Sequence, residues 1–245
     1  MNSYGVLAEH YDGLMPPAGH EAALRHYLSR FKEAKLPDGA AIIDLACGTG
    51  TIALALARLG YDLTGIDPSP DMLSVAARKS GGGRNPMWLC QSMQELDLND
   101  TADAAVCCFD GVNYLDTPGG LRRALRRIRL FLKPRGVFLF DVITPQAMAD
   151  MDGETFSSES DTTYCTWRPI FTGSKLYSQV DLFVRDGSLW RRHAETHVQR
   201  AYGMDELSDA LREAGFDRIR FTKAFTRQKA DSSQRRWSVC ARKAP

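Results

Sequence analysis

Long apolar runs, an excess of one charge and paired cysteines are all missing from this sequence. Its 245 residues carry 31 basic and 30 acidic side chains, a formal net charge of +1. Such a balance gives no long-range attraction to nucleic acid or to an anionic membrane. The chain starts without a basic segment followed by an apolar one, and no apolar run is long enough to cross a bilayer. We therefore expect a cytoplasmic protein with no membrane contact and no nucleic-acid partner.

The six cysteines show none of the spacings that bind metals or build disulfide frameworks. There is no C-x-x-C pair and no histidine at zinc-finger spacing, so buried thiols in a reducing compartment are expected. In HAETH, residues 193–197, the two histidines would stand about 13 Å apart on a strand, too far for one ion. We interpret this segment as a polar strand face and predict no metal.

Apolar runs alternate with helical patterns in the first part of the chain. The predicted strands are 41–46, 61–67, 86–90, 103–110 and 136–142, and the predicted helices are 51–59, 70–79 and 119–132. Nearly continuous apolar strands in this order predict a doubly wound α/β fold with a parallel sheet covered on both faces. The helix at 70–79 has a clear start, because Ser69 can cap it and Pro70 suits its first position.

The pattern changes after Val142. Two-residue alternation and turn signals in residues 164–202 predict an antiparallel insertion of two or three strands. A helix at 205–215 and two last strands, 217–225 and 235–243, would complete the sheet.

The chemistry is expected at the stretch IDLACGTG, where a strand runs into a glycine-rich turn that opens a helix. Such a turn offers unpaired backbone amides at the carboxyl edge of a sheet. Residues 48–53 also fit G-x-G-x-x-A, so a dinucleotide site stays open on this motif alone. Asp44 decides between the two, because an acid suits the ammonium and sulfonium of S-adenosylmethionine and not two phosphates. Asp67, at the end of the next strand, is placed to accept from both ribose hydroxyls, a role that NAD sites share.

The segments DLACGTG and TGIDPSPDML together resemble the first two motifs of class I S-adenosylmethionine-dependent methyltransferases. YGVLAEHYD, CQSMQELDL and FDGVNYL resemble further segments of the small-molecule members, including amino-sugar and glycine N-methyltransferases. The resemblance implies a mostly parallel seven-stranded sheet within one domain, residues 1–245. It implies four parts: a helical lid (1–36), a cofactor-binding core (37–142), an insertion over the active site (155–202), and a final helix with two strands (203–245).

The resemblance also implies roles for individual residues. The methionine part of the cofactor would lie along Ala46, Cys47 and Gly48, with Asp44 near its ammonium and Tyr11 reaching its carboxylate from the lid. Gly50 would allow close helix packing. Asp67 would hold the ribose. The adenine would contact a set of four residues, Pro68, Met72, Ser92 and the Met93 amide.

At Ser92 the sequence departs from the family, which commonly has Asp there. A neutral hydroxyl is a weaker acceptor for the adenine amine than a carboxylate, so we expect lower cofactor affinity. Phe109 and Asp110 would border the methyl-transfer site. Tyr114 follows the fourth strand at the same edge.

We predict in-line transfer of the sulfonium methyl to an amine or hydroxyl of a small molecule. A hydroxyl acceptor needs a base, for which His197, Tyr114, His10 and His20 are candidates. Two alternatives stay open: an NAD-dependent oxidoreductase, and an RNA-modifying or non-catalytic S-adenosylmethionine-binding protein. The basic run at 122–135 does not favour RNA, because leucines at helical spacing put its arginines on a solvated face. A homodimer is compatible with the sequence.

Overall fold

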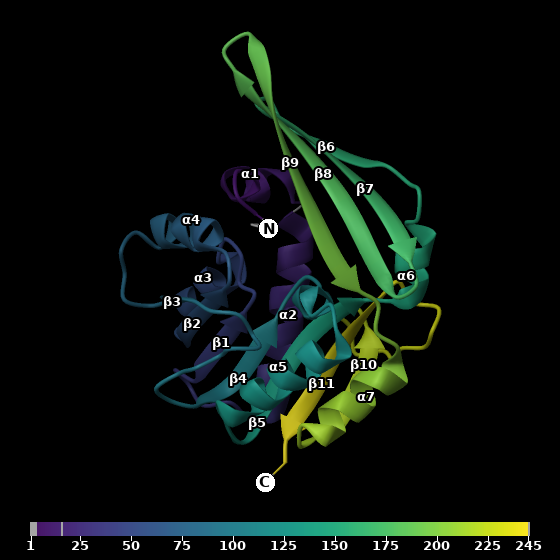
Figure 1. The fold of residues 1–245 in the computed structure, drawn as a ribbon. Helices are drawn as coiled ribbons and strands as arrows, with labels where there is room; N and C mark the ends of the chain where they lie inside the picture. Colours follow the sequence, from purple (N-terminus) through teal and green to yellow (C-terminus); the bar gives the residue numbers. More distant parts are fainter. Residues whose placement is uncertain (1–3, 16, 245) are drawn as a thin grey trace.

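The computed structural model describes residues 4–15 and 17–244. Residues 1–3 and 16, which belong to the predicted lid, lie outside the described residues, as does Pro245. The described chain forms a seven-stranded sheet in the order β10-β11-β5-β4-β1-β2-β3, and a separate four-stranded sheet beside it (Figure 1).

The central sheet is parallel except at one strand. Its members are β1 (Ala41–Leu45), β2 (Asp62–Asp67), β3 (Met87–Cys90), β4 (Ala102–Cys107), β5 (Leu132–Ile143), β10 (Phe216–Lys223) and β11 (Arg236–Lys243). β11 runs antiparallel to both β5 and β10. β1 lies between β2 and β4 and pairs parallel with each. The predicted doubly wound, mostly parallel seven-stranded sheet is confirmed.

Helices cover both faces of this sheet because consecutive strand residues, which point to opposite faces, are both apolar. The helices of the chain are α1 (Leu7–Leu14), α2 (Pro17–Ala34), α3 (Thr51–Arg58), α4 (Pro70–Ser80), α5 (Pro118–Leu130), α6 (Pro145–Asp150) and α7 (Met204–Glu213). α2 and α3 pack on one face, where they bury Ile42 and Val106. α5 and α7 pack on the other face, over Ile43 and Ala105. Ser69 caps α4 as predicted, because its hydroxyl accepts from the Met72 amide.

The insertion has one strand more than the sequence pattern predicts. Its four strands are β6 (Phe156–Glu159), β7 (Thr163–Thr172), β8 (Lys175–Asp186) and β9 (Leu189–Arg200), paired antiparallel in that order. β6 was missed because FSSE is short and largely exposed, so it shows no apolar alternation. The outer ends of β8 and β9 project beyond the rest of the molecule, and α1 lies beside the inner part of this sheet (Figure 1). Leu7 and Leu14 of α1 pack against Cys165 and Leu182 of the insertion.

All six cysteines are free thiols. Three are buried, but Cys90 is exposed, because β3 is the edge strand and the residue faces away from the core. Within the described residues, no helix is both long enough and apolar enough to cross a membrane. The same residues contain no cluster of three His, Cys, Asp or Glu that could hold a metal ion.

Candidate cofactor and acceptor site

The glycine-rich turn joins β1 to α3 at the carboxyl edge of the parallel strands. Ala46, Gly48 and Gly50 all have positive φ, at 50°, 54° and 76°. A Cβ on Gly50 would come within 2.4 Å of the Trp88 ring, so only glycine lets α3 start this close to β3. Gly50 therefore lies against Trp88 and is not part of the cavity beyond the turn.

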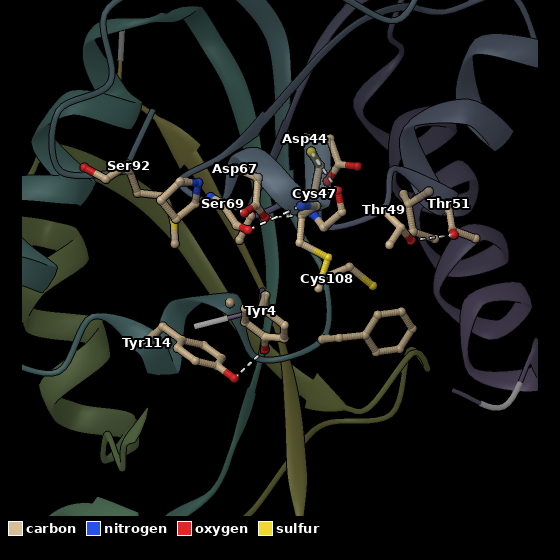
Figure 2. Close-up of a pocket in the computed structure, with 18 of the residues that line it drawn as sticks. Tyr4, Asp44, Cys47, Thr49, Thr51, Asp67, Ser69, Ser92, Cys108 and Tyr114 are labelled. Carbon is tan, nitrogen blue, oxygen red and sulfur yellow. Dashed lines mark hydrogen bonds between the residues drawn. The ribbon is translucent and has the colours of Figure 1, made fainter. Parts of the chain in front are cut away.

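A cavity of about 390 Å³ opens over this turn. Figure 2 shows residues from the ends of β1, β2 and β4, together with Tyr4, converging on it. The residues predicted from the sequence that line the cavity are Tyr11, Asp44, Ala46, Cys47, Gly48, Asp67, Pro68, Met72, Ser92, Met93, Phe109 and Tyr114. Of the predicted site residues, Gly50, Asp110 and His197 lie elsewhere.

Asp67 is held in place by backbone amides at the end of β2. Its Oδ2 accepts from the Gly48 amide and its Oδ1 from the Ser69 amide, both at 2.9 Å. Burial raises the pKa of Asp67, and the two amide hydrogen bonds oppose that rise. Each oxygen keeps lone pairs, so the carboxylate can still accept from a pair of vicinal hydroxyls.

Asp44 is a buried acid with an unused oxygen. The residue is 1% exposed, and its Oδ2 has no hydrogen-bond partner. Burial raises the pKa of Asp44 to about 8, a rise that a hydrogen bond from the Ala53 backbone reduces. A buried carboxyl oxygen without a hydrogen-bond partner is unfavourable. A cation in the cavity would stabilise the charged form of Asp44. Together, Asp44 and Asp67 fit S-adenosylmethionine, with an acceptor for an ammonium and a bidentate acceptor for a ribose.

Ser92 lies at one end of this cavity, in the loop after β3. Its hydroxyl donates to Glu95 Oε2 at 3.0 Å. With its proton directed to Glu95, the Ser92 oxygen presents lone pairs to a neighbouring donor. The Glu95 carboxylate is therefore hydrogen-bonded to the Ser92 hydroxyl, which stands where the family commonly has Asp.

A second cavity, of about 330 Å³, adjoins the first. The two share part of their lining, namely Tyr4, Tyr11, His20, Phe109 and Tyr114. The second cavity reaches under the insertion, from which it is lined by Trp167, Ser178, His197 and Gln199. A ligand in it would meet the sulfur end of a ligand in the first cavity at the shared residues.

Asp110 lines the second cavity, and each of its carboxylate oxygens has a partner. Its Oδ1 is 2.7 Å from Arg236 Nη2, and its Oδ2 accepts from the Gln199 amide. Arg236 also contacts buried Asp141, whose carboxylate accepts from the backbone amides of Phe109 and Asp110. Both oxygens of Asp110 therefore have a partner within the protein, Arg236 at Oδ1 and Gln199 at Oδ2.

Tyr114 and His197 belong to a chain of polar groups at the inner end of β9. The Tyr4 and Tyr114 hydroxyls are 2.5 Å apart, and Tyr114 Oη is 3.2 Å from His197 Nδ1. His197 Nε2 is 3.4 Å from Glu195 Oε2, which also accepts from the Tyr4 amide at 2.6 Å. Burial alone would raise the pKa of Glu195, but hydrogen bonds from His197 and from the Tyr4 amide lower it. Burial raises the pKa of Tyr4 and of Tyr114, so both phenols are neutral, and each can donate one hydrogen bond and accept another.

Of the other two candidate bases, His20 lines both cavities, whereas His10 lines neither. Sequence reasoning missed Tyr4, Glu195, Gln199 and Arg236. For Glu195 and Gln199 there was a signal, because residues two apart from His197 share its strand face. For Arg236, on β11, there was none.

Comparisons with known proteins agree with this geometry. A family profile described as a methyltransferase domain matches residues 42–136. YqeM of Bacillus subtilis (strain 168), which is classed as a methyltransferase, is 33% identical over 246 residues that cover 98% of this chain and 97% of its own. A crystal structure of an S-adenosylmethionine-dependent methyltransferase from Clostridium acetobutylicum superposes with a TM-score of 0.85 at 23% identity, over 98% of this chain and 97% of that one. CalS10, an amino pentose methyltransferase from Micromonospora echinaspora, superposes with a TM-score of 0.76 at 22% identity, over 98% of both chains.

The fold and the acid-lined cavity define a class I S-adenosylmethionine-dependent methyltransferase. The chain belongs to the methyltransferase family over nearly its whole length, and its acid-lined cavity fits S-adenosylmethionine as the methyl donor. The oxidoreductase alternative is therefore wrong: the acid at the end of β1 and the family relationship both favour the sulfonium cofactor.

Proposed function

We propose that the protein transfers a methyl group to a hydroxyl of a small molecule bound in the second cavity. The observation that carries this proposal is the meeting of two cavities at Tyr4, Tyr11 and Tyr114. One cavity has the acids that suit the cofactor, and the other is closed over by the insertion. Together they hold two reactants end to end, which is the arrangement that in-line transfer needs.

In this proposal the first cavity binds the cofactor as the sequence predicts. Asp44 faces its ammonium, Asp67 accepts from the ribose hydroxyls, and Tyr11 reaches the methionine carboxylate. Met72 and Pro68 contact the adenine, and Ser92 accepts from its amine. When bound, S-adenosylmethionine supplies a methyl group already activated on its sulfonium.

The chain's own residues orient the acceptor and take its proton. Phe109 and the three tyrosines at the shared wall exclude water from the line of transfer. The acceptor oxygen forms its bond to the methyl carbon as the carbon–sulfur bond breaks, and that electron pair stays on the departing thioether. The acceptor proton moves to Tyr114 Oη while the phenol proton moves to His197 Nδ1, and Glu195 stabilises the imidazolium that results.

Two features of the second cavity favour a hydroxyl over an amine. An aliphatic amine is protonated near neutral pH, and an ammonium would need an unpaired carboxylate to hold it. Among the described residues that line this cavity, Asp110 is the one carboxylate, and it is paired with Arg236. By contrast, the Tyr114–His197–Glu195 chain is suited to accept the proton that a hydroxyl must lose.

The test is methyl transfer from labelled S-adenosylmethionine to a panel of small alcohols, phenols, amino sugars and primary amines. We expect turnover with hydroxyl acceptors. In His197→Gln the acceptor rate should fall about 100-fold or more, while affinity for S-adenosylhomocysteine stays unchanged. Turnover of amines alone, at a rate that His197→Gln leaves intact, would show that the acceptor is an amine and that no base is used.

A further inference from the structure

A third cavity lies at the opposite edge of the central sheet from the methyl-transfer site. It encloses about 280 Å³ between the C-terminal end of α2 and the strands β5, β10 and β11. Val137 and Arg242, which line it, are register partners near the end of β11, where the pairing of β5 with β11 begins. The cofactor cavity stands where the parallel strands end, so the two sites are separated by the length of the sheet.

The lining of this cavity is strongly basic. Its charged residues are five cations and one carboxylate, namely Arg30, Lys35, Arg218, Arg220 and Arg242 with Glu33. Both oxygens of Glu33 are in use, because Oε2 pairs with Arg30 at 2.9 Å and Oε1 with Arg220 at 2.7 Å. The hydrogen bond from Arg30 has the larger effect and the one from Arg220 the smaller. Both lower the pKa of the Glu33 carboxyl, so Glu33 remains ionised. The lining therefore has no carboxylate left for Arg218, Arg242 or Lys35.

Arg30 lines this space and has a buried donor without a partner. The residue is 8% exposed, with Nη1 bound to Glu33 and Nη2 bound to the Thr226 carbonyl at 3.2 Å. Its Nε is buried and has no hydrogen-bond partner. A buried donor left without an acceptor is unfavourable. An acceptor atom in the cavity would remove that cost.

The backbone of β10 is distorted at the same place. Its register with β11 shifts between Asp217 and Arg220, and Arg218 within the shift has a φ of 48°. A bulge of this kind re-aims a side chain, and the left-handed region is unfavourable for a residue other than glycine. Here it turns Arg218 into the lining of the basic cavity, beside Arg242.

We propose that this cavity is a binding site for a diphosphate group, held by Arg30, Arg218 and Arg242. Guanidinium groups match phosphate oxygens in a two-pronged geometry, and the lining has a formal excess of four positive charges for a multiply charged anion. Free diphosphate and the diphosphate of a nucleotide present the same chemistry here. The site is independent of the acceptor and goes beyond the methyl-transfer function.

The experiment is calorimetric titration of the whole protein with inorganic pyrophosphate, ADP and AMP at low ionic strength. We expect one pyrophosphate per chain, bound more weakly as salt is added. Arg30→Gln and Arg218→Gln should each weaken binding about 10-fold or more. The matched control is Arg123→Gln, which removes an exposed arginine on α5 and should leave the affinity unchanged.

Affinity for S-adenosylhomocysteine reports whether each variant is folded, because the cofactor cavity is remote from all three substitutions. Tighter binding of ADP than of pyrophosphate would identify the nucleotide as the source, and equal binding would identify free diphosphate. The proposal is overturned if pyrophosphate does not bind. Equal weakening by Arg123→Gln, or binding of single-stranded RNA without pyrophosphate, would also overturn it.

Discussion

At the residue scale, we predict that Asp67 determines where the ribose of the cofactor lies. If its carboxylate accepts from two ribose hydroxyls, each charge-assisted bond contributes about 1.5–3 kcal/mol before the ribose regains water. Asp67→Ala should therefore weaken S-adenosylhomocysteine binding by about 2–4 kcal/mol, or roughly 30- to 1000-fold. Asp67→Asn should lose less, because one acceptor remains. Asp62→Ala, at the exposed start of the same strand, is the control. Wild-type affinity in a folded Asp67→Ala protein would require another placement of the ribose.

Ser92 and Glu95 give a second prediction at this scale. Ser92→Asp would restore the acid that the family commonly has, but it would place a second carboxylate beside Glu95 Oε2, which is 3.0 Å from the Ser92 hydroxyl. Like charges at that separation oppose each other. We expect Ser92→Asp alone to change S-adenosylhomocysteine affinity little, and Ser92→Asp with Glu95→Gln to raise it about 10-fold. Calorimetry on both variants and on Glu95→Gln measures the coupling. An equal gain from Ser92→Asp alone would mean that Glu95 does not act on the adenine position.

At the scale of the elements, the insertion has an inner part at the cavity and an outer part in solvent. Trp167 and Ser178 line the acceptor cavity, whereas Leu189 and Trp190 at the far end are 72% and 49% exposed. Trp167→Ala should raise the KM for the acceptor several-fold, because it removes a wall of the cavity, while cofactor affinity is unchanged.

The control for this prediction shortens the β8–β9 hairpin. Phe183 and Arg192 are cross-strand partners, so residues 184–191 can be replaced with a two-residue Asn-Gly turn between them. Steady-state kinetics should match those of the unmodified protein. A large change in acceptor KM on shortening would place acceptor selection at the outer end instead.

The elements also show what can be read from the sequence and what cannot. The strand, turn and helix at residues 41–58 were predictable, because a buried parallel strand is continuously apolar and the turn needs glycines at positive φ. The positions of Asp44 and Asp67 in the cavity lining were predictable from their places at strand ends, and their roles stay predictions. β6 could not be predicted, because its pairing depends on β7 and not on its own four residues.

Long-range pairing explains what sequence reasoning missed in the site. Arg236 binds Asp110 across 126 positions in the chain, and Tyr4 meets Tyr114 across 110. Neither contact follows from local periodicity, because each depends on where β11 and the N-terminal segment fall on the sheet. The sequence predicts that Asp110 borders the methyl-transfer site but does not predict its partners, Arg236 and Gln199, which bind both of its oxygens.

At the scale of the whole molecule, the buried acid Asp44 links cofactor binding to stability. Its pKa is about 8 in the folded protein and about 3.9 in an unfolded chain. Between these values the folded protein keeps a proton that the unfolded chain has lost, so the free energy of unfolding falls as pH rises. His26 acts in the opposite direction at lower pH, because burial lowers its pKa from 6.5 to about 4. Between pH 6.5 and 8 the unfolded chain also titrates at His26 and at cysteines whose pKa burial raises in the folded protein, so the contribution of Asp44 is the difference between the protein and its Asp44→Asn variant.

Chemical unfolding between pH 6.5 and 8 should show this link directly. Without ligand, the free energy of unfolding should fall by up to about 1.4 kcal/mol per pH unit, the limit for one proton. Saturating S-adenosylhomocysteine should flatten that slope, because its ammonium stabilises the ionised carboxylate and the proton leaves on binding. Asp44→Asn removes this titrating group, so its slope should be less steep than that of the unliganded protein and the same with and without ligand. The unliganded protein and Asp44→Asn would have the same slope only if Asp44 were already ionised before the cofactor binds. In that case the ammonium of the ligand is not needed to stabilise the Asp44 carboxylate.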